Sequence, residues 1–419
     1  MSVASFALLP RAGVEFTRAM TMPSAPESVP HQERWAALRL THPVINAPMA
    51  GAAGGAMATA VRRSGGLGFV AVGHGASDGL VSRELGLAAE LARADGSALP
   101  GSEPAGPGPS TAGPASTPGA ASGAARTGSW GVGLMAWSLA LENNAALHRA
   151  LEFDPPVIAL AAGDPTVPAA IAARAGAVVA VQVGTAAEVR AALAEPHIDV
   201  VVVRGAEGGG HGLNEAATLP LLQYALERSR LTASGSAPSG HAQPGAGFPA
   251  VGSKPVLAAG GIATVQGVAA VLAAGAAGAW VGTRFLPCAE SLFAPRLRDA
   301  IAAAGLDDTV YTSVFDLALG LPWPGEYGGR ALNNPVAAEW APRQEELRAA
   351  LERHDDAAQR LRERVTAARV AGDASAAPVY AGQSAGLVSQ TAVGQSVASV
   401  MAELGAVGPL LRAATDRWN

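Results

Sequence analysis

The sequence predicts an α/β protein: a (β/α)8 TIM barrel with a helical C-terminal add-on. Short apolar runs rich in Val, Ile and Ala alternate with helical patterns from residue 44 to residue 303. Eight such runs occur, and many of them end in glycine or a polar residue, as strands of a parallel sheet do. Eight parallel strands with intervening helices close into a barrel, which commonly takes about 250 residues as one unit.

The first four strands are expected at residues 44–49, 68–72, 130–134 and 157–160, with helices at 54–64, 82–94 and 167–175. The Gly65-Gly66 pair is a helix stop after the first of these helices. The last four strands are expected at residues 177–181, 200–203, 255–259 and 279–281, with helices at 186–194, 219–228, 265–274 and 289–303.

The barrel is expected over residues 36–306, after a poorly ordered N-terminal extension at residues 1–35. Two inserts, at 96–128 and 232–253, are rich in Pro, Gly, Ala and Ser and are expected to be flexible, because they hold too little apolar surface to offset the cost of ordering. Residues 307–419 do not continue the alternation and are expected to pack on the barrel as a helical extension, without forming a separate catalytic domain. That extension contains a Trp/Pro/Gly segment at 321–327, a charged helix around 343–371, a glycine-rich turn at 380–386 and a last helix at 396–404.

Composition narrows the class of partner. The formal net charge of −5 disfavours nucleic acid or an anionic membrane surface, so a small-molecule substrate fits better. The apolar run at 265–282 is dominated by Ala and Gly, which indicates a buried helix and strand and no membrane span. The single cysteine, Cys288, cannot form an internal disulfide, and the N-terminus lacks the layout of a secretory signal, so we expect a cytoplasmic protein. A homodimer is compatible with the sequence. The histidines show no metal-ligand spacing, so no catalytic metal is expected.

A glycine-rich loop follows the sixth strand and holds the first candidate for chemistry. The segment 200–212 reads VVVVRGAEGGGHG, so a buried strand leads into a loop with one carboxylate and one imidazole. Glycines beside His211 let a flat ligand approach the main chain, because no Cβ stands in the way. The plain alternative is a surface turn with a solvated histidine. Its place at the carboxyl end of a barrel strand, where barrel enzymes carry their active sites, favours catalysis by His211.

The turns after the seventh and eighth strands indicate a phosphate site. These turns contain Gly260-Gly261 and Gly282-Thr283-Arg284-Phe285. Free backbone N–H groups in glycine turns bind anions, and barrels often place a phosphate after strands seven and eight. A phosphorylated cofactor or substrate is therefore expected, although each glycine pair alone is also read as a helix stop.

Other rim residues have plainer readings. Gln182, at the end of the fifth strand, could satisfy backbone groups, but its neutral amide also suits the polar edge of a heterocycle. Glu207 is more often a solvated loop charge than a base, His74 more often structural than catalytic, and Cys288 a buried small side chain.

Five motifs together resemble the nitronate monooxygenases, formerly called 2-nitropropane dioxygenases. They are INAPMAG at 45–51, GGLG at 65–68, RGAEGGGHG at 204–212, AAGGI at 258–262 and VGTRF at 281–285, with a weaker match at 380–386. The resemblance implies an FMN-dependent TIM barrel. The set is less specific for the reaction, since flavin-dependent enoyl-acyl-carrier-protein reductases share nearly all of it.

The resemblance also implies residue roles. His211 would face the flavin and substrate as a base or hydrogen-bond donor. The flavin ring would be lined by Ala47, Pro48 and Met49, and the ribityl and phosphate groups would be held by Gly209, Gly260, Gly261, Gly282 and Thr283, with Gln182, Arg284 and Phe285 beside them. Two positions depart from the family pattern: Arg204 stands where glutamine is usual, and Gly133 where asparagine is frequent. A charge at Arg204 near the pyrimidine edge would stabilise an anionic reduced flavin.

The expected function is FMN-dependent oxidation of alkyl nitronates by dioxygen to a carbonyl compound and nitrite. One alternative is an NAD(P)H-dependent enoyl-thioester reductase on the same FMN barrel. Another is a flavin-free barrel lyase or isomerase acting on a sugar phosphate.

Overall fold

The computed structural model describes residues 29–96, 128–234 and 253–418, and its centre is the expected closed barrel. Eight parallel strands follow one another around the barrel in chain order, and the last pairs with the first through Trp280 and Ile45. The barrel strands are β1 (Val44–Asn46), β2 (Leu67–Ala71), β3 (Ser129–Met135), β4 (Val157–Ala161), β5 (Val178–Val183), β6 (Val200–Arg204), β8 (Val256–Ala259) and β9 (Gly278–Val281). The predicted fold class is confirmed.

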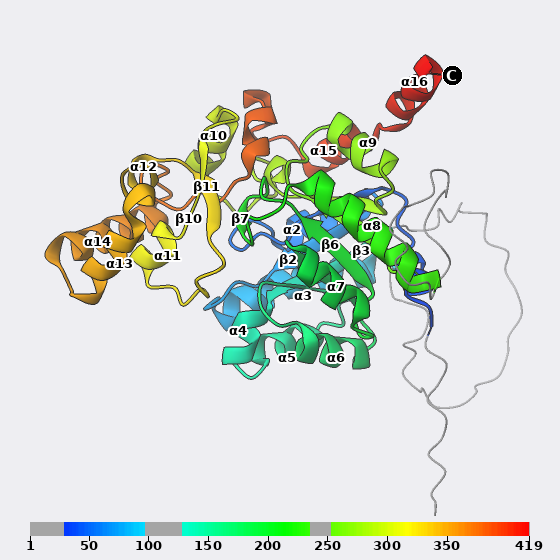
Figure 1. Cartoon of the computed structure of the whole chain (residues 1–419), viewed down its shortest axis with the longest axis horizontal. Helices are drawn as coiled ribbons and strands as arrows, with labels where there is room; N and C mark the ends of the chain where they lie inside the picture. Colours follow the sequence, from blue (N-terminus) through cyan, green and yellow to red (C-terminus); the bar gives the residue numbers. More distant parts are fainter. Residues whose placement is uncertain (1–28, 97–127, 235–252, 419) are drawn as a thin grey trace, which may run out of the picture.

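Helices surround the barrel (Figure 1). They are α2 (Gly55–Arg63), α3 (Asp78–Ala94), α4 (Ala136–Leu141), α5 (Ala145–Leu151), α6 (Thr166–Arg174), α7 (Ala186–Ala194), α8 (Thr218–Ser234), α9 (Val265–Ala273) and α10 (Pro295–Ala303). The helix expected at 289–303 begins only at Pro295, because proline is suited to the first turn of a helix and has no N–H to donate within it. The turn η1 (Thr283–Phe285) precedes it.

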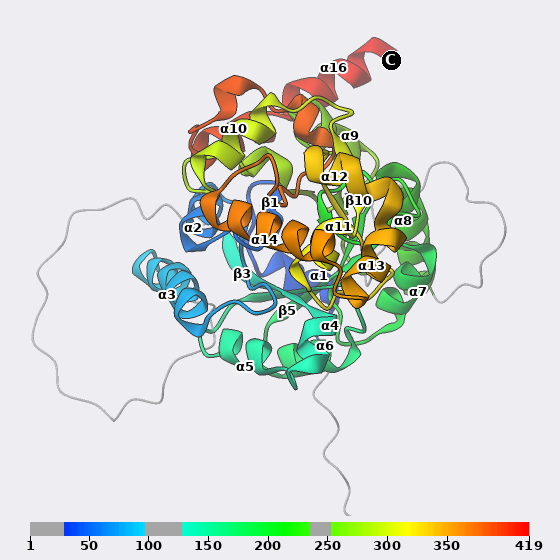
Figure 2. The same cartoon turned by 90° about the vertical axis from the view of Figure 1, so that its left-hand side faces the viewer.

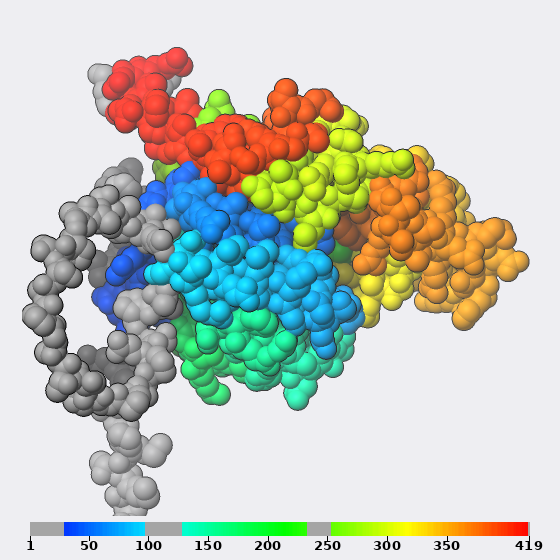
Figure 3. All heavy atoms as spheres, turned by 180° about the vertical axis from the view of Figure 1, so that it is seen from behind, coloured from blue at the N-terminus to red at the C-terminus, as the bar shows by residue number. Residues whose placement is uncertain are grey.

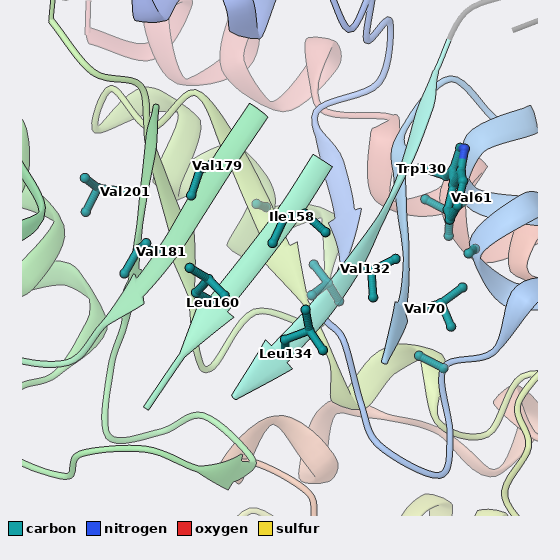
Figure 4. Close-up of a cluster of buried hydrophobic side chains, with 14 of the residues drawn as sticks. Val61, Val70, Trp130, Val132, Leu134, Ile158, Leu160, Val179, Val181 and Val201 are labelled. Carbon is teal, nitrogen blue, oxygen red and sulfur yellow. The ribbon is translucent and has the colours of Figure 1, made fainter. Parts of the chain in front are cut away.

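Alternate residues of each strand face opposite sides of the barrel wall. Outward residues such as Val132, Leu160 and Val181 pack in the layer beneath the helices (Figure 4). Inward residues such as Phe69, Val202 and Trp280 fill the barrel interior. This parity decides which side chains at the carboxyl ends of the strands face the barrel mouth.

The N-terminal end of the barrel is covered by a short helix that the sequence did not indicate. Helix α1 (His31–Ala36) lies mostly within the expected extension, so that expectation is wrong for residues 31–35. His31 Nδ1 and Arg34 Nε lie 2.8 and 3.3 Å from Oδ1 of Asp199, which explains why these residues dock. Residues 1–28 and most of the two expected inserts lie outside the described residues.

The C-terminal add-on lies across the carboxyl end of the barrel and is only partly helical. Strands β10 (Thr309–Thr312) and β11 (Gly329–Leu332) join β7 (Gly210–His211), from the histidine loop, in an antiparallel sheet of order β10-β11-β7. The helices of this lobe are α11 (Val314–Leu319), α12 (Pro335–Trp340), α13 (Gln344–Glu352) and α14 (Asp356–Ala371), with the turn η2 (Ala341–Arg343). Figure 2 shows these helices in front of the barrel, and Figure 3 shows the lobe projecting from the body.

The charged helix expected around 343–371 is two helices. Asp355 interrupts it in an extended conformation and accepts a hydrogen bond from Ala357 N at 2.8 Å, which caps α14. The chain then passes through η3 (Gln383–Leu387) and η4 (Gln390–Ala392) to α15 (Val397–Gly405) and α16 (Gly408–Trp418). In the described part of the chain, only residues 397–417 are long and apolar enough to span a membrane. That stretch is two helices, and the apolar residues Val397, Val400, Met401 and Leu404 of α15 are buried in the protein core.

Candidate active site

His211 lies where the barrel meets the add-on. The loop after β6 returns as β7 and pairs with β11, which places His211 opposite Gly329. His211 Nε2 lies 2.9 Å from both Oδ1 and Oδ2 of Asp316, which stands in the first turn of α11. The side chains are 11% and 5% exposed, so this contact is nearly closed to water. The plain reading of His211 as a solvated turn residue is excluded.

Asp316 has a second donor. Tyr380 Oη lies 3.2 Å from Asp316 Oδ1, and the Tyr380 ring is tilted against the imidazole of His211 at a centroid distance of 4.8 Å. Burial and the neighbouring Asp316 carboxylate raise the pKa of Tyr380 well above its usual value. The hydroxyl therefore stays protonated and donates to the carboxylate.

An aromatic segment covers the imidazole. Trp323 is stacked on His211, with ring centroids 3.7 Å apart and planes 4° from parallel. Trp323 also contacts Trp137, from the rim after β3, with ring centroids 4.9 Å apart. Tyr327 Oη accepts a hydrogen bond from Gly163 N, at the rim after β4. The Trp/Pro/Gly segment at 321–327 therefore joins the add-on to the barrel rim directly beside His211.

The guanidinium of Arg204 holds the loop that carries His211 by hydrogen bonds to its carbonyl oxygens. Its Nη2 donates to the carbonyl oxygens of Gly208 at 2.6 Å and Gly210 at 3.0 Å, and its Nη1 donates to Leu213 O at 3.2 Å. The residue is only 5% exposed, and burial lowers the pKa of its guanidinium to about 10. The carbonyl oxygens of the loop therefore stabilise the buried positive charge of Arg204.

Most of the inward-facing strand positions next to the barrel mouth hold small residues. By the parity of the strands, the inward positions next to the mouth are Ala47, Ala71, Gly133, Ala161, Gln182, Arg204 and Gly282. A methyl group at Gly133 would overlap the Pro48 ring, and one at Gly282 would stand 3.5 Å from Ala47 Cβ and 3.6 Å from Met49 Sδ. The predicted ring-lining residues thus adjoin one another. Among the described residues, no hydrogen bond is formed by the Gln182 side chain, so its amide remains available to a ligand.

The two glycine turns offer free donors. Gly260 and Gly261 have φ values of +100° and +72°, which side chains rarely adopt, and Gly261 adjoins Glu207. Within the described part of the chain, no hydrogen bond is formed by the backbone N–H of Gly260, Gly261, Gly282 or Thr283. Consecutive amides in such turns make an anion-binding concavity. The residues present therefore fit the phosphate group that the sequence predicts.

The segment at 380–386 closes the rim between these turns and the histidine loop. Gly382 N donates to Thr283 Oγ1 at 3.0 Å, and Gln383 N donates to Glu207 O at 3.0 Å. A Cβ on Gly209 would overlap the Gly382 backbone. Gly209 is thus explained by the close approach of this segment.

Comparison with known proteins identifies the family to which the chain belongs. A sequence model of the nitronate monooxygenase family matches residues 134–403, more than half of the chain. The nitronate monooxygenase npaC of Metarhizium robertsii is 34% identical over 162 residues, which cover 36% of this chain and 39% of that protein. The chain belongs to the nitronate monooxygenase family. Membership makes it an oxidoreductase, although the matched stretch spans only about two fifths of this relative's length.

Solved structures agree on the fold. A nitroalkane oxidase from Streptomyces ansochromogenes superposes with a TM-score of 0.62 at 23% identity, covering 91% of this chain and 99% of that one. FabK from Thermotoga maritima superposes with the same TM-score and identity, covering 92% and 97%. At this identity the likeness concerns the fold alone.

Two of the predicted cofactor residues of this family member lie away from the mouth. Arg284 Nη2 donates to Gln395 Oε1 at 2.8 Å and Glu403 Oε2 at 2.7 Å, which fastens α15 to the barrel. Phe285 is fully buried in the core between strands and helices. Both side chains serve packing in this structure, whereas the backbone before them forms the glycine turn.

The plainer readings of His74 and Cys288 agree with their surroundings, whereas Glu207 is not a solvated loop charge. The Glu207 carboxylate accepts from Thr218 N at 3.1 Å and Thr218 Oγ1 at 2.9 Å, at the start of α8. His74 contacts Glu142 Oε1 at 3.0 Å on the rim, and burial raises the pKa of the Cys288 thiol to about 12. None of these groups touches His211 in the described contacts. No group of three metal-ligating side chains occurs among the described residues.

The residues that sequence reasoning missed are those of the add-on: Asp316, Trp323, Tyr327 and Tyr380. The Trp/Pro/Gly segment and the glycine-rich turn at 380–386 were visible as unusual stretches. Asp316 carries no local signal, because an aspartate in the first turn of a short helix is common.

Proposed function

We propose that this protein is an FMN-dependent enzyme that oxidises alkyl nitronates with dioxygen to a carbonyl compound and nitrite. The observation that carries the proposal is the contact between His211 and Asp316, where the barrel meets the add-on. His211 is held by Asp316 and covered by Trp323, in a chain of the nitronate monooxygenase family whose glycine turns after β8 and β9 carry backbone amides that are free among the described residues.

Several residues of the chain would contact FMN. Ala47, Pro48, Met49 and Gly133 lie close together and would offer a surface for a flat ring. The free amides of Gly260, Gly261, Gly282 and Thr283 suit the phosphate. The amide of Gln182 would face the polar edge of the ring. FMN would supply the electron transfer between substrate and dioxygen that no side chain can perform.

The protein's own residues would bind and orient the substrate. A nitronate is an anion, and the imidazole of His211 can donate a hydrogen bond to its oxygen atoms when protonated. Trp323 and Trp137 would limit access of water on that side, which strengthens hydrogen bonds to the bound anion. The Asp316 carboxylate lies behind the imidazole and accepts a hydrogen bond from its Nε2.

An enoyl-thioester reductase is the alternative, because the same motif set occurs in that class and FabK shares this fold. Such an enzyme needs NAD(P)H as electron donor. A flavin-free lyase or isomerase would need the anion site only for its substrate phosphate.

Three measurements separate these functions. Heat release of the bound cofactor from purified protein, followed by chromatography against FMN and FAD, identifies the flavin or its absence. Anaerobic mixing then asks which donor bleaches the flavin: a nitronate alone supports the proposal, whereas rapid bleaching by NADPH with no response to nitronates supports the reductase. Under air, nitrite formed from the nitronate is measured against dioxygen consumed. A colourless protein would contradict both flavin functions.

A further inference from the structure

The contact between His211 and Asp316 decides which ring nitrogen carries the proton. An ionised carboxylate only accepts hydrogen bonds, and both of its oxygens lie 2.9 Å from Nε2. Nε2 must therefore be protonated in both the neutral and the charged ring. Nδ1 is the nitrogen that gains or loses a proton, and no hydrogen bond to it is formed among the described residues.

We propose that Asp316 is a positioning residue that keeps the proton of His211 on Nε2 and makes Nδ1 the atom that accepts a proton from a carbon acid. The inference rests on the proposed function. With a neutral nitroalkane, the Cα–H bond breaks and its electron pair becomes the C=N bond of the nitronate. The proton forms the N–H bond at Nδ1, and the imidazolium is stabilised by the carboxylate behind it.

The surroundings of Asp316 support this role. The carboxylate is 5% exposed, so it is nearly withdrawn from water and needs donors to remain charged. The structure provides two, the imidazole of His211 and the hydroxyl of Tyr380. Trp323 holds the ring from one face, which prevents the imidazole from turning to offer its other nitrogen. An indole face also attracts the cationic ring that forms after proton transfer.

The pair is made from two parts of the chain that are 105 residues apart. His211 comes from the barrel loop and Asp316 from α11 of the add-on. The add-on therefore takes part in the active site and does more than cover it. The pairing of β7 with β11 places His211 opposite Gly329 and so holds the barrel loop against the add-on that carries Asp316.

The first test is a direct observation of the tautomer in the flavin-loaded protein. The histidines are labelled with ¹⁵N, and the ring of His211 is assigned as the signal that disappears in His211→Gln. Long-range proton–nitrogen spectra at a pH where the ring is neutral then show which nitrogen is protonated. We expect Nε2–H in the parent protein; an Nδ1–H ring would overturn the proposal without any need for activity.

The second test compares a neutral nitroalkane with its preformed nitronate as substrates of Asp316→Asn. The amide can donate to Nε2 and so favours the wrong tautomer. We expect kcat/KM for the nitroalkane to fall by about 10²–10⁴-fold, the usual worth of a general base, with a much smaller change for the nitronate. An α-deuterium isotope effect on the nitroalkane should rise, since proton removal becomes slower.

Asp355→Asn is the matched control, because Asp355 lies in the same lobe, away from His211, and asparagine caps a helix as well as aspartate does. It should behave as the parent on both substrates. Equal losses of Asp316→Asn on both substrates, or no loss on either, would overturn the positioning role. If the parent enzyme oxidises neither substrate, the proposed function is contradicted. The role of Asp316 is then tested by the tautomer measurement alone.

Discussion

Trp323 lies flat on His211, with 3.7 Å between ring centroids and 4° between planes. The indole comes from the add-on and the imidazole from the barrel loop, so this stack is one of the contacts by which the two parts form a single site. Replacing Trp323 tests how much the stack contributes.

We expect Trp323→Ala to lower kcat/KM for a nitronate by about two- to thirteenfold, the equivalent of the ~0.5–1.5 kcal/mol that an aromatic pair contributes beyond its buried area. Trp323→Phe should retain most of the activity, because a smaller ring can still stack. Steady-state kinetics at saturating FMN checks both. Full activity in the alanine variant would show that the imidazole needs no cover.

His211→Asn should lose turnover while keeping its flavin. The imidazole is the only group at the mouth that the described contacts join to both Asp316 and Trp323, whereas the expected flavin contacts are made by other residues. We expect kcat to fall by about 10²-fold or more. The absorbance of bound flavin after gel filtration serves as the control. Unchanged turnover on every nitronate and nitroalkane tested would refute the assignment.

Arg204→Gln, which restores the residue usual in the family, should weaken the fold and spare the flavin's redox behaviour. Glutamine cannot reach all the carbonyl oxygens of Gly208, Gly210 and Leu213, so buried acceptors lose their donors. We expect the free energy of unfolding to drop by about 1–3 kcal/mol. Denaturant titration measures this, and a reductive titration measures the flavin potential. A large change in potential at constant stability would instead place the guanidinium against the flavin.

The lowered pKa of the buried Lys254 makes the free energy of unfolding depend on pH. Its Nζ donates to Ala192 O, and burial lowers the pKa of its ammonium to about 8 in the folded chain. Between pH 8 and the ordinary lysine pKa of about 10.5, the unfolded chain binds more protons than the folded chain, so this residue makes stability rise with pH in that window. We expect Lys254→Met to remove that rise. The free energy of unfolding of both proteins, measured from about pH 7.5 to 10, gives the difference; parallel curves would contradict the shifted pKa.

The sequence predicted the barrel well because its signals are local. Short apolar runs, glycine stops and helical periods all lie within about a dozen residues, so β5 and β6 were located almost to the residue. The expected helix at 343–371 was wrong in one detail, since Asp355 caps a new helix within it. The strands β10 and β11 were missed because each is short and lies in a small antiparallel sheet, in which β11 pairs with β10 and with β7 from a distant loop.

For the residues at the barrel rim, the sequence likewise predicts the position of the backbone but not the direction of the side chain. Gly260, Gly261 and Gly282 could be placed at the mouth because a barrel puts every strand's carboxyl end there. The direction of a long side chain is another matter. Arg284 follows the same strand as Gly282 yet reaches out to Glu403, because the pairing depends on α15, more than a hundred residues later.

The sequence by itself determined the eight-stranded barrel, its glycine turns and the position of His211 at the mouth, since these follow from short-range patterns and from the geometry of any parallel barrel. Only the tertiary structure decided what surrounds that histidine. Asp316, Trp323 and Tyr380 reach it from a lobe whose docking depends on the pairing of β7 with β11 and on buried contacts between distant segments. Such contacts leave no periodic trace in the chain, because each residue alone looks like an ordinary member of its own loop or helix.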